Sequence, residues 1–392
     1  MRIIHCLRAP VGGLFRHVLD LSAAQAQQGH DVGMIADSQA TDALTRQRLD
    51  AIAPRLALGV TQIAMHRTPS LCDVAAHRAI TAHVRDLDLD VLHGHGAKGG
   101  AFARLAGRAL KAQGHRVKTF YTPHGGTLNY APRSLEGRFF LTAEKILDGM
   151  TDGLIFESAF AARVYGERVG PGLAPRRVIH NGLQPDDFKP VSPAADASDF
   201  LYIGELRALK GVDVMLRALA ALNAARDIAL TATLVGSGPD APSLMQLASD
   251  LGLARAVVFP GAMPAALAFP KGRILIVPSR KESFPYVVLE AAAAGMALIS
   301  TNVGGIPEIV EGTDTALIAP DDVAALAHAM AGAVADPGSA QAKAVRLQAA
   351  IADRFTVARM TQAVVEFYAE AGASQAACQP NPCASQPKLQ HA

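Results

Sequence analysis

Two glutamates on either side of a predicted helix start are the residues best placed for chemistry in this sequence. Glu282 lies in a polar loop after an apolar run, and Glu290 lies in the apolar stretch that follows. Pro285 between them suits the first position of a helix. The free N–H groups and positive dipole at such a helix start bind anions. We therefore expect a diphosphate beside Ser283, Phe284 and Pro285, sugar hydroxyls at Glu282 and a ribose at Glu290.

A single glutamate in such a position is more often a solvated surface charge. Here the order of strand, loop, proline and helix is followed by a second apolar run and the turn Gly304-Gly305. The ordered set favours a binding site over two unrelated surface charges.

A basic loop follows the apolar run near residues 200–204 and carries Arg207 and Lys210. Cations at this position neutralise the charge that develops on a leaving diphosphate, which is commonly the largest catalytic contribution. Glu205 would repel the diphosphate, so we expect it to turn away or to bind an acceptor group. The alternative for Lys210 is a surface lysine at a helix start.

Two glycine-containing turns follow other apolar runs. Gly12 and Gly13 come after the first run, where paired glycines let the backbone approach a ligand closely. Gly236 lies in the sequence Leu-Val-Gly-Ser-Gly, which we interpret as a packing turn that leaves room for a nucleotide base. The turn at Gly236 is a weak signal when taken alone.

Histidines end two of the predicted strands. His124 is placed to bond a donor-sugar hydroxyl or to position the acceptor, although a histidine at a strand end is often structural. We interpret His95 and Lys98 as residues at the cleft edge that meet the acceptor. His93 and His95 have no third ligand paired with them in the sequence, and the Asp-x-Asp-x-Asp segment 86–90 precedes a strand. The sequence therefore predicts no metal site.

Short apolar runs alternate with longer amphipathic ones, which predicts two lobes of parallel sheet covered by helices. A helix is expected over 17–28, and the residues that we expect to form strands are 2–7, 31–36, 91–93, 118–122, 153–157, 177–180, 200–204, 229–235, 257–260, 274–278 and 297–301. The Pro- and Ser-containing segment 187–198 indicates a linker between the lobes. We expect a first domain over 1–190, a second over 191–355, a helix over 356–373 that crosses back, and a disordered tail over 374–392.

The composition excludes several classes of function. The chain has 392 residues, of which 50% are hydrophobic, 5% are aromatic and none is Trp. This argues against a stacking surface for nucleic acid and for two globular cores. The N-terminus does not read as a signal peptide and no run is long enough to span a membrane. Of the four cysteines, Cys6 is expected to be buried and inert. Cys378 and Cys383 are close enough in sequence to pair, but free thiols in a reducing cytosol are the simpler interpretation.

With these motifs in order along nearly the whole chain, the sequence resembles the family-four retaining glycosyltransferases. The resemblance rests on Glu282-x7-Glu290 in the setting Pro-Ser-Arg-x-Glu-x-Phe-Pro, supported by the Gly-Gly loop, the His-Gly pair at His124 and Lys210. It implies the GT-B fold and a metal-independent transfer with retention, in which His124, Lys210 and Glu282 are catalytic. The family's usual Arg is replaced here by Glu205, so Arg207 is a candidate substitute.

The resemblance also implies a nucleotide-diphosphate sugar as substrate, with UDP favoured over GDP, and no further cofactor. The acceptor would be a glycan or a lipid-linked sugar in bacterial cell-surface polysaccharide or lipopolysaccharide biosynthesis. A net basic first half and a net acidic second half agree with a cytoplasmic protein that also meets the inner face of the membrane. Two alternatives stay open, namely a nucleotide-sugar epimerase on the same fold and a non-catalytic nucleotide-sugar-binding protein.

Overall fold

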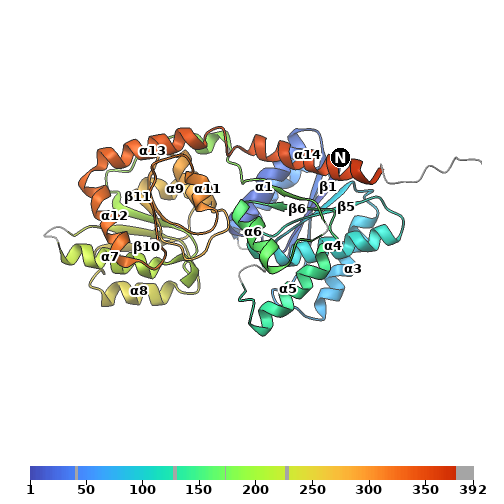
Figure 1. The fold of residues 1–392 in the computed structure, drawn as a ribbon, viewed down its shortest axis with the longest axis horizontal. Helices are drawn as coiled ribbons and strands as arrows, with labels where there is room; N and C mark the ends of the chain where they lie inside the picture. Colours follow the sequence, from blue (N-terminus) through green and yellow to red (C-terminus); the bar gives the residue numbers. More distant parts are fainter. Residues whose placement is uncertain (40–42, 127–129, 173, 226–228, 377–392) are drawn as a thin grey trace, which may run out of the picture.

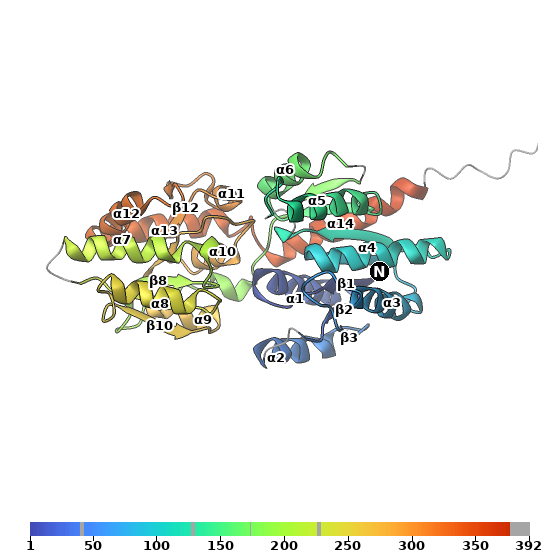
Figure 2. The same ribbon diagram turned by 90° about the horizontal axis from the view of Figure 1, so that it is seen from below.

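The chain folds into two α/β lobes that face each other (Figures 1 and 2). The computed structural model describes residues 1–39, 43–126, 130–172, 174–225 and 229–376, with the backbone alone for 372–376. Each lobe holds a parallel sheet with helices packed on both faces. The prediction of two doubly wound α/β domains is therefore confirmed.

The first lobe is built on a sheet with the strand order β3-β2-β1-β4-β5-β6-β7 over the described residues. Neighbouring strands pair in parallel, so most successive strands are joined by a crossover helix. Its elements are β1 (Arg2–Leu7), α1 (Gly12–Gln27), β2 (Asp31–Asp37), α2 (Ala43–Ile52), β3 (Val60–Ile63), α3 (Cys72–Arg85), β4 (Val91–His95), α4 (Gly96–Ala112), β5 (Lys118–Thr122), α5 (Leu135–Asp148), β6 (Gly153–Phe156), α6 (Ala159–Arg168) and β7 (Arg176–Val178).

The second lobe repeats this plan with the strand order β10-β9-β8-β11-β12-β13. Its central strands β8 and β11 are buried on both faces, as expected for a parallel sheet between helices. Its elements are β8 (Ser198–Ile203), α7 (Val212–Ala224), β9 (Ala232–Val235), α8 (Ala241–Asp250), β10 (Val257–Gly261), α9 (Ala265–Ala268), β11 (Gly272–Val277), α10 (Tyr286–Ala293), β12 (Ala297–Thr301), α11 (Ile306–Val310), β13 (Leu317–Ile318), α12 (Val323–Ala335) and α13 (Pro337–Ile351).

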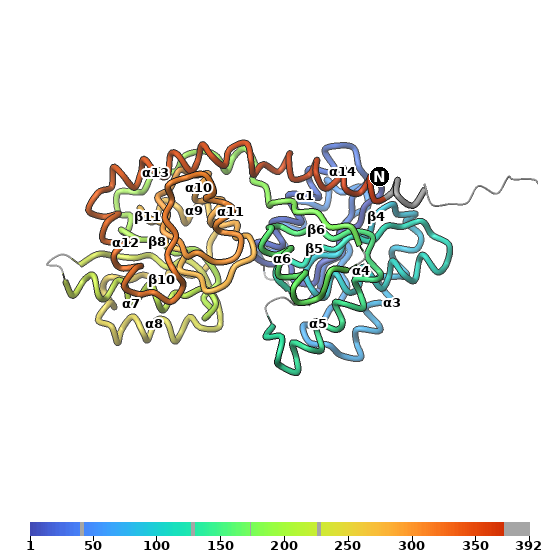
Figure 3. The backbone as a smooth tube through the Cα atoms, in the orientation of Figure 1, coloured from blue at the N-terminus to red at the C-terminus, as the bar shows by residue number. Residues whose placement is uncertain are grey.

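The last helix, α14 (Val357–Ala376), returns from the second lobe and lies along the first (Figure 3). It packs on α1, β5 and β6. Its apolar face places Val364, Phe367 and Tyr368 against Ile3 and Phe120 of the sheet, all of them buried. The first lobe therefore depends on the C-terminal end of the chain for part of its core.

Several predicted boundaries differ from the structure. The first helix starts at Gly12, five residues before the predicted start, so the paired glycines form its first turn. The strands β3 and β13 were not predicted, because β3 is a short edge strand with little burial and β13 has only two residues. Most of the predicted tail, including Cys378 and Cys383, lies outside the described residues.

One further sequence prediction is confirmed by burial. Cys6 is fully buried in β1, and burial raises the pKa of its thiol to about 12. The aspartates of segment 86–90 are exposed at the amino end of β4, away from the carboxyl ends of the strands. None of the helices in the described part of the chain combines the length and apolar character needed to cross a membrane.

Candidate active site between the lobes

A cavity of about 1230 Å³ lies between the two lobes. It is bounded by loops that follow β1, β5, β8 and β11 and by the linker near Asp187. These loops leave the carboxyl ends of parallel strands, where open α/β sheets bind their ligands. The predicted site residues that line the cavity are Gly12, Gly13, His124, Arg207, Lys210, Glu282, Ser283, Phe284, Pro285 and Glu290.

Lys210 and Glu282, two of the predicted catalytic residues, form an ion pair. Lys210 Nζ lies 2.7 Å from Glu282 Oε1, and the Ser279 hydroxyl donates to the same oxygen at 2.7 Å. Lys210 ends a short 3-10 helix, η4 (Ala208–Lys210), after β8, and Glu282 lies on the loop between β11 and α10. The carboxylate therefore holds the ammonium group at the wall of the cavity.

The loop that carries Glu282 lies directly on the Gly304-Gly305 turn. Gly304 has a φ of +62°, and a Cβ there would lie 2.0 Å from the Glu282 carbonyl oxygen. Gly305 N donates to the Ser283 carbonyl oxygen at 2.8 Å. Only glycine permits both the left-handed φ and this close approach. The glycine pair therefore packs against the Glu282 loop and fixes its position.

The start of α10 also faces the cavity. Pro285, predicted as the first helical residue, is the N-cap, so the helix begins one residue later than predicted, at Tyr286. Tyr286 and Val287 both line the cavity. Their N–H groups precede the first intrahelical hydrogen bonds, so they are available to an anion. Gly13 makes room for this arrangement, since a Cβ there would lie 3.2 Å from the Tyr286 ring.

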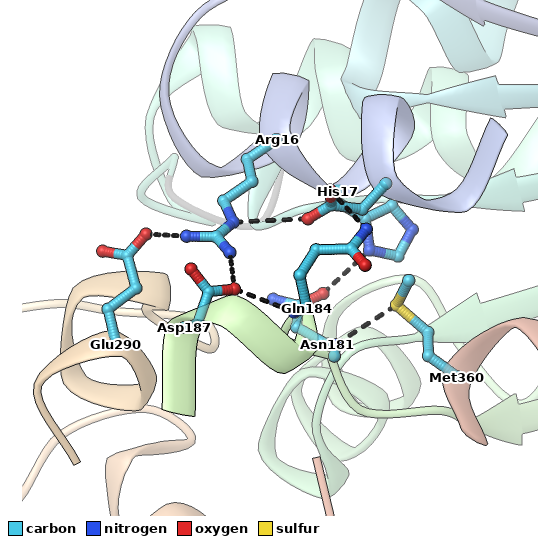
Figure 4. Close-up of polar contacts among 9 residues, drawn as sticks. Arg16, His17, Asn181, Gln184, Asp187, Glu290 and Met360 are labelled. Atoms are coloured by element: carbon cyan, nitrogen blue, oxygen red, sulfur yellow. Dashed lines mark hydrogen bonds and ion pairs between the residues drawn. The ribbon is translucent and has the colours of Figure 1, made fainter. Parts of the chain in front are cut away.

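Arg16 contacts three carboxylates, one of which, Glu290, belongs to the other lobe (Figure 4). Its Nη1 donates to Glu290 Oε1 and its Nη2 to Asp187 Oδ2, while its Nε lies 3.3 Å from Asp20 Oδ2. Burial raises the pKa of Glu290, and the nearby Arg16 offsets this only in part. The residue predicted to bind ribose is therefore held by a cation from the other lobe. Sequence reasoning missed Arg16 in this role.

Arg207 lies on the same loop as Glu205, and the two side chains pair weakly. Arg207 Nη1 is 3.6 Å from Glu205 Oε2, and both side chains are well exposed. Both residues line the cavity. Glu205 has therefore not turned away from the cavity, contrary to one of the two outcomes expected from the sequence.

His124 has the strained backbone that often marks functional sites. Its φ of +50° lies in the left-handed region, which is unusual for a residue other than glycine. Its Nε2 lies 3.1 Å from His95 Nδ1, and His95 Nε2 lies 2.9 Å from His5 Nδ1. Burial lowers the pKa of His124 and His95 well below the ordinary value. These imidazoles are therefore neutral near pH 7.

The expectation that His93 and His95 stand without a third imidazole is wrong. His5 on β1 lies beside both of them on β4, and one nitrogen from each of the three rings falls within 4.8 Å of the others. The sequence could not show that His5 lies beside these histidines, because β1 and β4 are adjacent in the sheet while His5 and His95 are 90 residues apart in the chain.

Three predicted site residues, Lys98, Gly236 and His95, lie outside the cavity lining. Lys98 is bound to Asp73 at 2.8 Å and to the Thr68 carbonyl oxygen at 3.0 Å, so it ties α4 to α3 and to the segment before it. Gly236 packs against β8, where a Cβ would lie 1.8 Å from the Gly204 carbonyl oxygen. The expected contact of Lys98 with the acceptor and of Gly236 with the donor finds no support in this placement. His95 lies behind His124 and is itself buried.

Sequence reasoning also missed a polar contact between the lobes at the cavity edge. Glu308 accepts from the backbone N–H groups of Ala159 and Phe160, each at 2.9 Å, and lies 3.0 Å from His180 Nε2. Ser283 Oγ donates to Glu157, whose pKa is raised by burial. These residues connect α11 and the Glu282 loop with the start of α6.

Two facing doubly wound lobes, with the cavity at the carboxyl ends of both sheets, define the GT-B class of glycosyltransferases. The model of the family described as Glycosyltransferase Family 4 matches residues 11–187, and that of Glycosyl transferases group 1 matches residues 197–336. A glycogen synthase of Mycobacterium tuberculosis (strain CDC 1551 / Oshkosh) is 30% identical over 399 residues, covering 94% of each chain. The chain belongs to this glycosyltransferase family.

Solved structures agree on the fold. Anabaena HepE in complex with UDP-glucose has a TM-score of 0.77 at 20% identity, covering 94% of this chain and 100% of that one. WaaG, a glycosyltransferase involved in lipopolysaccharide biosynthesis, has a TM-score of 0.72 at 16% identity, covering 94% and 99%. At this level of identity the likeness establishes the fold alone.

Proposed function

We propose that this protein is a retaining, metal-independent glycosyltransferase that moves a hexose from a UDP-sugar to a glycan or lipid-linked acceptor. The observation that carries the proposal is the Lys210–Glu282 pair beside the start of α10, in a cavity formed by both lobes. The pairing of a cation with a free helix start suits a diphosphate. The UDP-glucose bound to HepE supports uracil as the base and a hexose as the sugar.

The same cavity provides a place for each part of the donor. The diphosphate would lie between Lys210 and the first N–H groups of α10, and the ribose would compete with Arg16 for Glu290. The sugar would lie toward Glu282 and His124. His124 has no partner at Nδ1 among the described residues, so this nitrogen is free to bond a sugar hydroxyl.

In the proposed reaction the acceptor oxygen attacks the anomeric carbon on the face from which the diphosphate leaves. The carbon–oxygen bond to the β-phosphate breaks, and its electron pair stays on the phosphate oxygen. That oxygen takes the proton of the acceptor hydroxyl. Lys210 and the start of α10 stabilise the charge that develops there, and contact between the lobes excludes water.

We assign the reaction to bacterial cell-surface polysaccharide or lipopolysaccharide biosynthesis in the cytoplasm, at the inner face of the membrane. The fold shared with WaaG supports this assignment, as does the net basic first lobe, which suits an anionic surface. The acceptor would enter from the first lobe, where His124 and the paired glycines line the cavity.

Lys210→Ala tests the proposal. We expect turnover of a UDP-hexose to fall roughly 10²- to 10³-fold, because one preorganised cation at the leaving oxygen is lost. Turnover is measured as release of UDP, with and without EDTA, against GDP- and ADP-sugars. The matched control is Lys343→Ala, an exposed lysine on α13, which should leave turnover unchanged.

Three results would contradict the proposal. Near wild-type turnover in Lys210→Ala would remove that residue from catalysis. Complete loss of activity in EDTA would contradict metal independence. Binding of UDP, seen as a rise in melting temperature, without transfer or hydrolysis of any sugar would favour a non-catalytic binding protein.

A further inference from the structure

Five histidines of the first lobe form one cluster beside the cavity. The ring centroids are 5.1 Å apart for His5 and His95, 4.0 Å for His93 and His95, 5.4 Å for His95 and His124, and 4.8 Å for His17 and His124. The cluster offers two sets of three imidazoles whose nitrogens lie close enough to share an ion, His5-His93-His95 and His17-His95-His124.

In the first set, His5-His93-His95, here called the inner set, most ring nitrogens already make hydrogen bonds. His93 contacts the Tyr368 hydroxyl at 2.6 Å through Nδ1 and the Thr122 hydroxyl at 2.9 Å through Nε2. His5 contacts Gln25 Oε1 at 2.7 Å and His95 at 2.9 Å. An ion there would have to break several buried hydrogen bonds, which is costly. This set is a hydrogen-bonded part of the core.

The second set, His17-His95-His124, here called the outer set, differs because the Nε2 atom of His17 carries a lone pair that makes no hydrogen bond among the described residues. Asn181 Nδ2 donates to the Phe284 carbonyl oxygen at 3.0 Å, so Asn181 Oδ1 is the atom that faces His17 Nδ1 at 2.9 Å. An amide oxygen only accepts, so His17 carries its proton on Nδ1 and its Nε2 bears a lone pair. Within the described part of the chain no group donates to that Nε2.

The other two nitrogens of the outer set already have nearly the required spacing. His95 Nδ1 and His124 Nε2 are 3.1 Å apart, with one proton between them. A tetrahedral zinc ion with Zn–N distances of 2.0–2.1 Å separates its ligands by about 3.3 Å. When an ion takes the place of that proton, the proton moves to the other nitrogen of the same imidazole ring. Binding of the ion therefore releases no proton from the protein.

In two of the three histidines, the ring nitrogen that would not bind the ion has the kind of partner that metal-bound histidines usually have. His17 Nδ1 bonds Asn181, and His95 Nε2 bonds His5, which in turn bonds Gln25. Such second contacts fix the tautomer and orientation of ligating imidazoles.

We propose that His17, His95 and His124 bind one divalent transition-metal ion of the zinc type, with Co²⁺ and Ni²⁺ as alternatives, at the first-lobe wall of the cavity. The ion-free protein is the active form of the transferase proposed above. Because His124 lines the cavity, an ion bound to it would hold its ring away from the donor sugar. Zinc would then inhibit transfer, a consequence that rests on the proposed function.

The binding test does not depend on turnover. The full chain without an affinity tag is titrated with Co²⁺, and the visible absorption of tetrahedral cobalt is recorded before Zn²⁺ is added. We expect one Co²⁺ per chain and complete displacement by Zn²⁺. His17→Gln should weaken Co²⁺ binding by more than about 100-fold, because 100-fold is about the most that is lost when only a hydrogen-bond partner of a metal ligand is removed.

The controls separate the cluster from surface sites and from misfolding. His328→Gln changes an exposed histidine of α12 and should leave the titration unchanged. His124→Gln changes a loop residue that is not fully buried, so it reports on the site even if His17→Gln fails to fold. Melting temperatures without metal identify a misfolded variant.

Two outcomes would overturn the site. The first is unchanged affinity in His124→Gln or in a folded His17→Gln, which would point to the inner set. The second is a titration without tetrahedral cobalt absorption, which would mean binding by surface imidazoles only. Neither result affects the transfer proposal, because release of UDP is measured without added metal.

Discussion

Arg16 is surrounded by more negative charge than it can balance. Asp20, Asp187 and Glu290 all contact its guanidinium group, so the group of four carries a net negative charge when every carboxyl is ionised. The guanidinium also lies 5.1 Å from the centre of the Tyr286 ring. Removing one partner of a buried ion pair leaves charge without compensation, which costs more than the pair contributes. Arg16 should therefore matter to stability as well as to donor binding.

We expect Arg16→Gln to lower the free energy of unfolding by about 1–3 kcal/mol at pH 8, less than the roughly 3–5 kcal/mol of a fully buried pair, because the side chain keeps 23% of its surface exposed. Burial already raises the pKa of Glu290, so the unpaired charge disappears as the pH falls. The difference between variant and wild type should therefore narrow toward pH 5. Denaturant titrations at both values measure it.

Arg163→Gln is the matched control, because Arg163 pairs with Glu167 at 3.3 Å with both side chains largely exposed. Exposed pairs contribute at most about 1 kcal/mol. Equal losses in the two variants, or a gap that widens at low pH, would show that Arg16 does not compensate buried carboxylates.

Site residues could be predicted from the sequence where the pattern around them is local, and not where their partners are distant in the chain. Lys210, Glu282 and the start of α10 follow from local order, because a strand, its loop and the next helix are continuous in the chain. Arg16 meets Glu290 across 274 residues, and no local pattern reports such a pair. Lys98 shows the opposite case, since its position after a strand suggested a ligand, whereas in the structure it pairs with Asp73.

At the scale of elements, strands with buried apolar runs were predictable and edge strands were not. β1, β5 and β12 match their predicted bounds, because burial on both faces of a parallel sheet demands continuous apolar residues. β13 joins the sheet through only two residues, so it leaves no such run. That His5 would meet the histidines of β4 and the end of β5 could not be predicted from the sequence either, because only the sheet brings these strands together.

Those buried histidines predict a pH dependence of stability. Burial lowers the pKa of His5 and His17 to about 4 and that of His93, His95 and His124 well below 6.5. Below pH 6.5 these histidines therefore bind protons in the unfolded chain but not in the folded chain. The free energy of unfolding consequently decreases as the pH falls. Each such histidine contributes a slope of up to about 1.4 kcal/mol per pH unit.

Denaturant titrations between pH 7.5 and pH 5 at constant ionic strength measure this slope. His17→Gln should reduce it, whereas His328→Gln, which removes an exposed histidine, should not. Stability that does not change between these pH values would mean that the cluster is open to protons in the folded state.

At the scale of the whole molecule, the two chain crossings between the lobes are hydrogen-bonded to each other. Leu183 N donates to the Phe355 carbonyl oxygen at 2.9 Å, and Val357 N donates to the Leu183 carbonyl oxygen at 2.9 Å. The linker and the segment before α14 therefore form a short parallel pair. This pair is where the lobes must turn if donor binding closes the cavity, since the remaining contacts between them are made by side chains and loops.

Gly182 sets the separation of these two crossings, and it supports the last prediction. A Cβ at this position would lie 2.4 Å from the Thr356 carbonyl oxygen, so Gly182→Ala must push the crossings apart. We expect a loss of about 1–3 kcal/mol in the free energy of unfolding, as for other overpacked sites, together with a higher KM for the UDP-sugar. Gly332→Ala is the control, because its Cβ would meet nothing within 4 Å and alanine stabilises a helix by roughly 0.5–1 kcal/mol over glycine. A Gly182→Ala variant as stable as the wild type would show that the crossings are not held at this separation. An unchanged KM despite lost stability would place the lobe movement elsewhere in the chain.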